Sequence, residues 1–362
     1  MSRVKTVSIV VSLLLALVAA CGGKGPSKIA APELPPVDEN LGDLAPAGVV
    51  GALWIDVEQL RGSVLWEAIP ILESALQADE MRRITGVDPL EVVDELLIVV
   101  DDAGEDSGEA LALLKGSFSS DEVLASISRA GEGVPIDIGE APGLRTEEFV
   151  LAAITDRTIA LGDENTARAA VELAAGSGEP LSSDPKLKHL GSSGAAIEAV
   201  LRRGVSAPAF TRFEGGGLPF DALDRATDFE ITVDAGEGLC IEAAVTAETK
   251  LDAAGLARDF TELADRLAQN GFALLLGVDW LVEKIEISHD GSRVLARLQL
   301  AETDVVQLRR LFERLDKIRR LGEQSDSAPE LGPPPDISIP TLEQPLRLKP
   351  DDSAAPPAEK SE

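Results

Sequence analysis

The side chains best suited to catalysis are few in this sequence. It contains two histidines among 362 residues. His189 stands in the run Lys-Leu-Lys-His-Leu, and His289 ends an alternating stretch beside a turn; neither has an acid or a nucleophile at a telling spacing. A catalytic triad is defined by three-dimensional geometry that spacing alone does not supply. We therefore expect both imidazoles to be exposed or structural.

The one cysteine of the body, Cys240, lies in a stretch whose alternation predicts a strand. On that pattern its side chain faces away from Leu239 and Ile241 and lies beside Glu242 and Ala244. Because no histidine is near in sequence, a structural thiol covered by a helix is favoured over a nucleophile. The chain also lacks Gly-x-Ser-x-Gly, His-Glu-x-x-His and phosphate-loop motifs. We predict no catalytic residue, no resident metal or cofactor, and no enzymatic activity.

An acidic, glycine-containing loop over residues 101–109 is the one cluster that suggests a metal. Carboxylate oxygens around glycines suit Ca²⁺. The loop nevertheless lacks the Asp-x-Asp-x-Asp-Gly run of an EF-hand, and acidic loops arise easily in a chain this acidic. We expect a solvated hairpin loop here, with calcium binding as the alternative left open.

The most informative chemistry lies in the first 21 residues. Arg3 and Lys5 form a positive n-region, and residues 7–20 are apolar apart from two serines. That stretch is shorter than the ~18 residues typical of a membrane span, so it fits the h-region of a secretory signal. It ends in Val18-Ala19-Ala20-Cys21, where small residues precede a thiol. An ordinary secretory signal with an incidental cysteine is the alternative.

The sequence Val18-Ala19-Ala20-Cys21 resembles the lipobox of bacterial lipoproteins. The resemblance implies cleavage between Ala20 and Cys21, diacylglycerol on the Cys21 sulfur, and a further acyl chain on the new amino group. Several acyl chains anchor a protein stably, since each buried methylene contributes ~0.8 kcal/mol. The residue after Cys21 is Gly22. An aspartate at this position would resemble a signal for retention in the inner membrane, and its absence indicates sorting to the outer membrane. The resemblance therefore predicts a lipid-anchored protein of the bacterial cell envelope, sorted to the outer membrane.

The composition is strongly acidic. The formal net charge is −30, and loss of Arg3 and Lys5 with the signal peptide makes it −32. This excludes nucleic acid as a plausible partner, because nucleic-acid binding needs a basic surface. At 44% hydrophobic residues the chain can still bury a real core. The membrane, reached through the lipid anchor, and an envelope protein are the partners that we expect.

Composition and periodicity divide the chain into six segments. They are a signal peptide (1–20), a proline-rich tether (21–46), an N-terminal α+β unit (47–205), a glycine-rich connection (206–224), a C-terminal α+β unit (225–319) and a proline-rich, acidic, disordered tail (320–362).

We predict an α+β fold of two tandem ββαββα-like units, with mainly antiparallel sheets covered by helices. In the first unit, strands are expected over 96–100, 109–115, 149–154 and 158–161, with helices after Ser120 and Asp163. In the second, alternating strands near 229–233 and 239–245 precede a helix, a hairpin at Asp290-Gly291 and a closing helix. Residues 195–203 read as one helix of the intervening connection.

The body also resembles uncharacterised bacterial envelope proteins built from repeated α+β units. The matching motifs are Gly86-Val87-Asp88-Pro89 before a strand and Leu161-Gly162-Asp163 before a helix. This resemblance implies no known activity. The expected function is that of a non-catalytic binding or scaffold protein. A periplasmic carrier or assembly factor with an apolar groove is one alternative, and an enzyme that uses carboxylates alone is another.

Overall fold

The computed structural model describes residues 40–63, 66, 88–101, 110–147, 149–202, 225–236, 238–269 and 279–311. Internal contacts divide the chain into Met1–Asp316 and Lys317–Glu362, and every described residue belongs to the first unit. Within the described part, no helix is long and apolar enough to cross a membrane.

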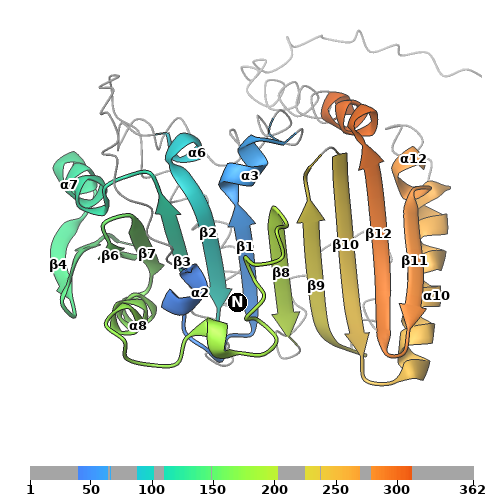
Figure 1. The fold of residues 1–362 in the computed structure, drawn as a ribbon, viewed down its shortest axis with the longest axis horizontal. Coiled ribbons are helices and arrows are strands. Elements are labelled where there is room, and N and C mark those ends of the chain that lie inside the picture. The colour runs from blue at the N-terminus through green and yellow to red at the C-terminus, as the bar shows by residue number, and fades with distance from the viewer. Residues whose placement is uncertain are drawn as a thin grey trace, which may run out of the picture. The chain divides into compact units, whose positions relative to one another are not determined.

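The described part is built on one 12-stranded sheet in which every neighbouring pair is antiparallel. The strand order is β11-β12-β10-β9-β8-β1-β2-β3-β7-β6-β5-β4 (Figure 1). The strands are β1 (Gly51–Asp56), β2 (Val93–Val100), β3 (Ala110–Gly116), β4 (Val134–Ile138), β5 (Ala141–Arg145), β6 (Val150–Thr155), β7 (Thr158–Gly162), β8 (Ile197–Arg202), β9 (Ala226–Asp234), β10 (Gly238–Ala247), β11 (Ile285–Asp290) and β12 (Arg293–Ala301).

Helices accompany both ends of this sheet. They are α2 (Leu41–Leu44), α3 (Val57–Arg61), α6 (Pro89–Val92), α7 (Ser120–Ala130), α8 (Glu164–Ala174), the 3-10 turn η2 (Leu181–Ser183), α10 (Lys250–Ala268), α12 (Asp279–Val282) and a helix over 302–311. The α+β class and the antiparallel pairing predicted from sequence are therefore confirmed.

Local sequence explains most of these elements. Three longer helices begin at residue types that commonly cap helices: Ser119 accepts from the N–H of Glu122, Asp163 from those of Asn165 and Thr166, and Thr249 from that of Asp252. These bonds satisfy donors that the first helical turn leaves free. The hairpin β11–β12 turns where predicted, and its loop residue Gly291 has φ +59°, which glycine adopts without strain.

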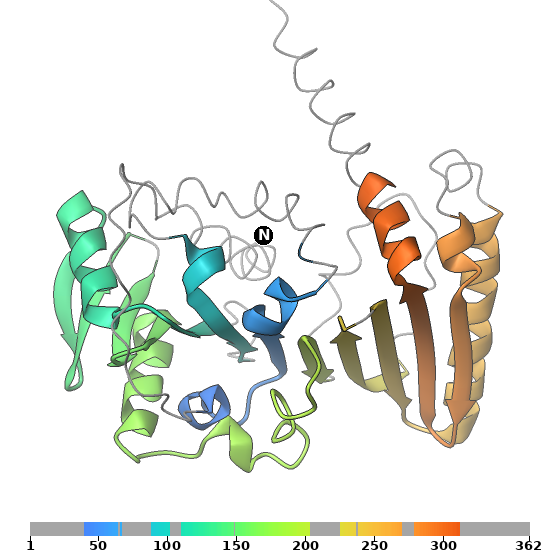
Figure 2. The same ribbon diagram turned by 45° about the horizontal axis from the view of Figure 1, so that its top comes forward.

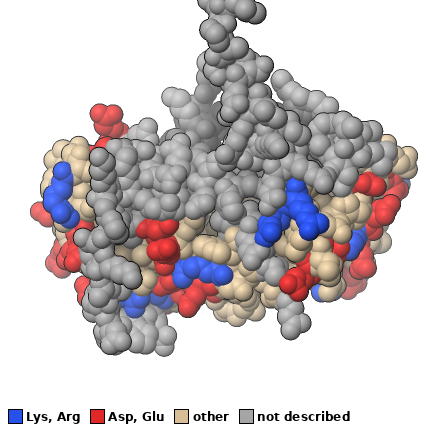
Figure 3. All heavy atoms as spheres, turned by 90° about the horizontal axis from the view of Figure 1, so that it is seen from above, with Lys and Arg blue, Asp and Glu red and all other residues tan. Residues whose placement is uncertain are grey.

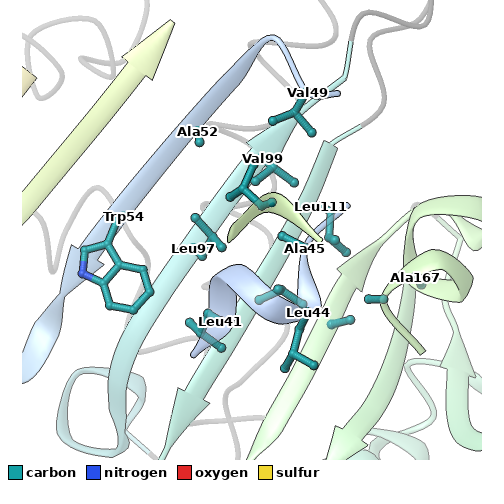
Figure 4. Close-up of a cluster of buried hydrophobic side chains, with 14 of the residues drawn as sticks. Leu41, Leu44, Ala45, Val49, Ala52, Trp54, Leu97, Val99, Leu111 and Ala167 are labelled. Carbon is teal, nitrogen blue, oxygen red and sulfur yellow. The ribbon is translucent and has the colours of Figure 1, made fainter. Parts of the chain in front are cut away.

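The sheet has two faces, which we name after neighbouring residues of β1. The Trp54 face of β1, β2 and β3 packs under α2, η2 and α8. Its core is drawn in Figure 4 and includes Leu41, Leu44, Trp54, Leu97, Leu111 and Ala167. The opposite Leu53 face packs against α7 in this part of the sheet, through Leu124 and Ile127.

In the C-terminal strands, described helices pack against the Leu53 face alone. The Leu53 face continues through Val233, Val245 and Val294, which belong to cores shared with α10 and with the helix over 302–311. Helix α10 runs beside β11 at the edge of the sheet (Figure 2). The Trp54 face of β9, β10, β12 and β11 instead carries alternating polar side chains, as expected for an antiparallel sheet with one hydrated face.

Three features differ from the sequence-based predictions. Residues 195–203, predicted as a helix, contain strand β8, which pairs with β1 and β9. Their alanine, leucine and arginine content favours a helix, but the place between two strands decides the conformation. Through this strand, both predicted α+β units join one sheet. The first unit also contains an unpredicted hairpin, β4–β5, between α7 and β6.

The packed body also begins before residue 47. Helix α2 lies within the segment predicted as a tether, yet Leu41 and Ala45 are fully buried and Leu44 is nearly so. Two leucines in a short segment gave no helical periodicity, so only their burial reveals them as core. The signal peptide, most of the tether, the 206–224 connection and the tail lie outside the described residues.

Candidate functional site

The sequence-predicted site residues fall into two groups. Ala20 and Cys21, the predicted cleavage and lipid-attachment residues, lie outside the described residues. Both histidines are described, and both are exposed, as expected: His189 in a turn and His289 on β11. Of the acidic loop 101–109, only Asp101 is described, so the calcium alternative stays a prediction. The described residues contain no cluster of three or more potential metal ligands.

Cys240 faces as predicted but is covered differently. It is half-buried on the Trp54 face of β10, whereas α10 and the helix over 302–311 pack against the opposite face. The prediction of a helix-covered thiol is therefore wrong for the described helices. The Nε of Arg297 donates to the Cys240 Sγ at 3.4 Å, and Arg297 also pairs with Glu242 at 3.2 Å. The bond to Cys240 and the neighbouring charges raise the pKa of Arg297.

On the Trp54 face of β9, β10, β12 and β11, acidic and basic side chains lie next to each other and form ion pairs. Arg297 stands between Glu242 of β10 and Glu286 of β11 in the ladder, and Arg293 reaches Glu230 of β9 at 2.6 Å. In Figure 3, which views the molecule from a different side, basic and acidic side chains of the described residues are likewise interspersed. The described acidic side chains visible in that view are thus not gathered into one patch.

A connecting segment, residues 181–196, crosses the Trp54 face beside Trp54 and is fixed by a buried carboxylate. Glu198 is only 3% exposed. Its Oε1 accepts from the N–H of Gly191 at 3.1 Å and from the hydroxyl of Ser193 at 2.7 Å. Buried carboxylates need such donors, because desolvation of the charge is costly. Glu198 therefore latches the segment onto the sheet.

Gly191 is required at this contact for two reasons. Its φ is +76°, a region that side chains with a Cβ rarely adopt. A Cβ built on it would also lie 2.7 Å from Cε2 of Trp54, which is itself only 6% exposed. The backbone of Gly191 thus packs directly onto the indole ring.

Two ion pairs hold the start of the same segment. Arg202 of β8 donates to Asp184 at 2.6 Å, and Lys186 contacts Asp228 of β9 at 2.9 Å. Partial burial acts to raise the pKa of Asp184. The hydrogen bonds from Arg202 and from the N–H of Lys186, together with both positive charges, outweigh that effect, so the pKa is lowered. Asp184 is therefore a structural anion rather than an acid.

A second lowered carboxyl pKa lies at the start of the helix over 302–311. Asp304 accepts from Lys284 at 2.6 Å and from the N–H of Ala301 at 2.9 Å, and both bonds lower its pKa. The Ala301 contact has the geometry of a capping box, which satisfies a free donor at the helix start. Lys284 also lies over the ring of Trp280.

A small pocket lies on the Trp54 face, where β2 ends and α8 begins. Its volume is about 230 Å³. Apolar side chains from the segment before β1, from β2 and from β3 form much of the wall, and polar side chains lie where the pocket meets the end of β2 and the first turn of α8. The lining residues are Pro46, Val49, Val99, Asp101, Leu111, Asn165, Thr166 and Ala169.

The polar groups of this pocket differ in how they are bonded. The hydroxyl of Thr166 is engaged with the backbone oxygen and the carboxylate of Asp163. The Asp101 carboxylate and the Asn165 side-chain amide have no hydrogen-bond or ion-pair partner within the described part of the chain. Both residues are exposed and therefore accessible to a ligand.

Sequence reasoning found Asp101 as part of the acidic loop, but it missed the other pocket residues and Glu198. Nothing in the local pattern marks Val49, Asn165 or Ala169, because the pocket is formed by four separate segments of the chain. The one available signal for Glu198 was a glutamate within an otherwise apolar stretch, Ala195 to Leu201, and a helix interpretation places that residue on a solvated face.

Comparison with known proteins finds a likeness of fold only. No family model and no curated protein sequence matches the chain. Among solved structures it is similar to TP0453 of Treponema pallidum. Crystal form III matches with a TM-score of 0.47 at 10% identity, covering 75% of this chain and 97% of that chain. Form I gives 0.43 at 10% identity, with 76% and 98% covered, and form IV gives 0.43 at 11%, with 75% and 96% covered. At these values the likeness carries no inference about ligand, partner or location.

Proposed function

We propose that this protein is a lipid-anchored, non-catalytic protein of the bacterial cell envelope that binds or scaffolds another envelope component. The lipobox carries the proposal: Val18, Ala19, Ala20 and Cys21 all match, behind a positive n-region and a short apolar stretch. A thiol immediately after two small residues is suited to acylation followed by cleavage. Gly22 in place of aspartate favours the outer membrane as the destination.

The carboxyl groups of the described body bear on the alternative of a carboxylate-based enzyme. Among the described residues, two carboxyl groups have clearly displaced pKa values, and the pKa values of both, Asp184 and Asp304, are lowered. A carboxylic acid that donates a proton near neutral pH needs a raised pKa instead. A carboxylate-based enzyme therefore gains no support from these groups.

The pocket at the end of β2 gives no support to the carrier alternative. Its volume of about 230 Å³ lies below the ~300–1,000 Å³ typical of sites for drug-sized ligands. A lipid is larger still. The clusters beneath the described helices contain nearly or fully buried leucines, including Leu97, Leu113, Leu161 and Leu256.

Membrane fractionation tests the anchor. We expect the natural chain in the membrane pellet, and the Cys21→Ala chain uncleaved or released but not acylated, as mass spectrometry of the mature N-terminus would show. A Cys240→Ala chain is the matched control, since it removes the other thiol and should keep the anchor. An acylated or membrane-bound Cys21→Ala chain with a cleaved signal would refute the lipoprotein assignment.

Crosslinking in cells tests the binding role. Photo-reactive residues at Ser288, exposed on the Trp54 face of β11, and at Leu251, 82% exposed on α10, sample two sides of the body. A binding protein gives a discrete heteromeric adduct from at least one position, and Cys21→Ala should weaken it by removing the protein from the membrane. Monomer alone from both positions would contradict the scaffold role.

A further inference from the structure

We infer that the pocket between the end of β2 and the first turn of α8 binds a small organic cation: a compact apolar body that carries an ammonium group. This inference goes beyond the proposed function and does not depend on the anchor. It starts from the lining, in which Val49, Val99 and Leu111 supply apolar wall and Asp101 supplies an anion.

The charge of the pocket selects the sign of the ligand. Asp101 has no cation bound to it among the described residues, whereas other carboxylates near the Trp54 face, such as Asp184, Glu230 and Glu242, are paired with arginines. An unpaired carboxylate beside an apolar wall favours a positively charged group and opposes an anion. The free Asn165 side chain adds an amide oxygen that can accept a second hydrogen bond from an ammonium.

The helix start does not reverse this preference. The N-terminus of α8 would attract an anion if its N–H groups were free. Here the Asp163 carboxylate already accepts from the N–H groups of Asn165 and Thr166 at 2.7 and 3.0 Å. The Asp163 cap therefore occupies these N–H donors and offsets the partial positive charge of the helix start. Asp101 is then the charged group of the pocket lining that determines which ligand charge is favoured.

The size of the pocket limits the body of the ligand. At about 230 Å³ it is smaller than a drug-sized site, so one ring or a short branched chain is the upper limit. The small side chain of Ala169 helps to keep the space open. A larger side chain at this position would occupy the volume without removing any polar group.

Three probes with the same ring separate charge from apolar fit: benzylammonium, benzyl alcohol and benzoate. Saturation-transfer NMR on the full chain in detergent micelles, with empty micelles as the blank, measures their binding. We expect benzylammonium to bind about two- to fivefold more tightly than benzyl alcohol, the gain of an accessible ion pair, and benzoate to bind weakest. Asp101→Asn should bring the ammonium and alcohol affinities to the same value.

Two alanines of α8 provide a matched pair for the location. Ala169→Leu should abolish binding of all three probes, whereas Ala174→Leu, at an exposed alanine outside the pocket, should leave the affinities unchanged. Circular dichroism reports whether each variant is folded. Because Asp101 is exposed, Asp101→Asn tests the inference without changing the packing of the core. No probe signal above the blank, equal affinity for ammonium and alcohol in the natural chain, or binding that survives both Asp101→Asn and Ala169→Leu would overturn it.

Discussion

Substituting Gly191 by alanine tests whether the 181–196 segment is held through direct contact with Trp54. Two costs are expected. Holding an alanine at a φ of +76° costs about 1–2 kcal/mol. The added Cβ would meet the indole at 2.7 Å, and relieving such overpacking costs about 1–3 kcal/mol more. The expected loss in the free energy of unfolding is therefore about 2–5 kcal/mol.

The same segment offers a matched control. Gly194 has a φ of +80°, but nothing lies within 4 Å of the Cβ that alanine would add. Gly194→Ala should therefore lose only the conformational part, about 1–2 kcal/mol. The difference between the two variants isolates the contact with Trp54.

Urea unfolding followed by circular dichroism measures each loss from the shift of the midpoint at constant slope. A double-mutant cycle then assigns the cause: in a Trp54→Leu background, Gly191→Ala should lose about 1–3 kcal/mol less than in the natural chain, because the ring it strikes is gone. Equal losses for Gly191→Ala and Gly194→Ala, or no coupling to Trp54→Leu, would refute the packing argument.

Two further predictions concern the carboxylates. Glu198→Ala removes the acceptor of two part-buried hydrogen bonds, from the N–H of Gly191 and the hydroxyl of Ser193, so we expect a loss of about 0.5–1.5 kcal/mol per bond in urea unfolding. Glu198→Gln keeps an acceptor oxygen and should lose less; equal losses would contradict the latch. The pKa values of Asp184 and Asp304 are lowered from 3.8, so in acid the unfolded chain binds protons that the folded chain does not. Their contribution is therefore complete above the unfolded pKa and is lost as pH falls through the lower folded pKa. Unfolding titrations below pH 5 should show a shallower loss of stability for Asp184→Asn and Asp304→Asn than for the natural chain, and unchanged slopes would argue against both ion pairs.

Local elements were predictable because short-range chemistry determines them. The caps at Ser119 and Asp163 satisfy free N–H groups within three residues of the cap, and the turn after Asp290 needs only a glycine at positive φ. Alternating side chains identified β9 and β10 because one face of each strand carries apolar residues and the other carries mostly polar ones. In each case the interacting groups are near neighbours in the chain.

Elements fixed by distant contacts were not predictable. Residues 197–202 became a strand because β1 and β9 flank them with a matching register, which outweighs their helical composition. Leu41 and Leu44 became core because α2 packs against a sheet whose strands follow it in the chain. The pocket combines residues 46–49, the end of β2, Leu111 of β3 and the start of α8, so no single stretch of sequence contains it.

The sequence by itself determined the predicted cellular location of this protein. A signal peptidase and an acyltransferase act on an extended segment, so Val18-Ala19-Ala20-Cys21 is informative without any fold. Only the tertiary structure decided that both α+β units share one antiparallel sheet, that Glu198 latches a crossing segment, and that Asp101 meets an apolar pocket. Burial and cross-strand register arise from contacts between residues far apart in the chain, and neither composition nor spacing encodes those contacts.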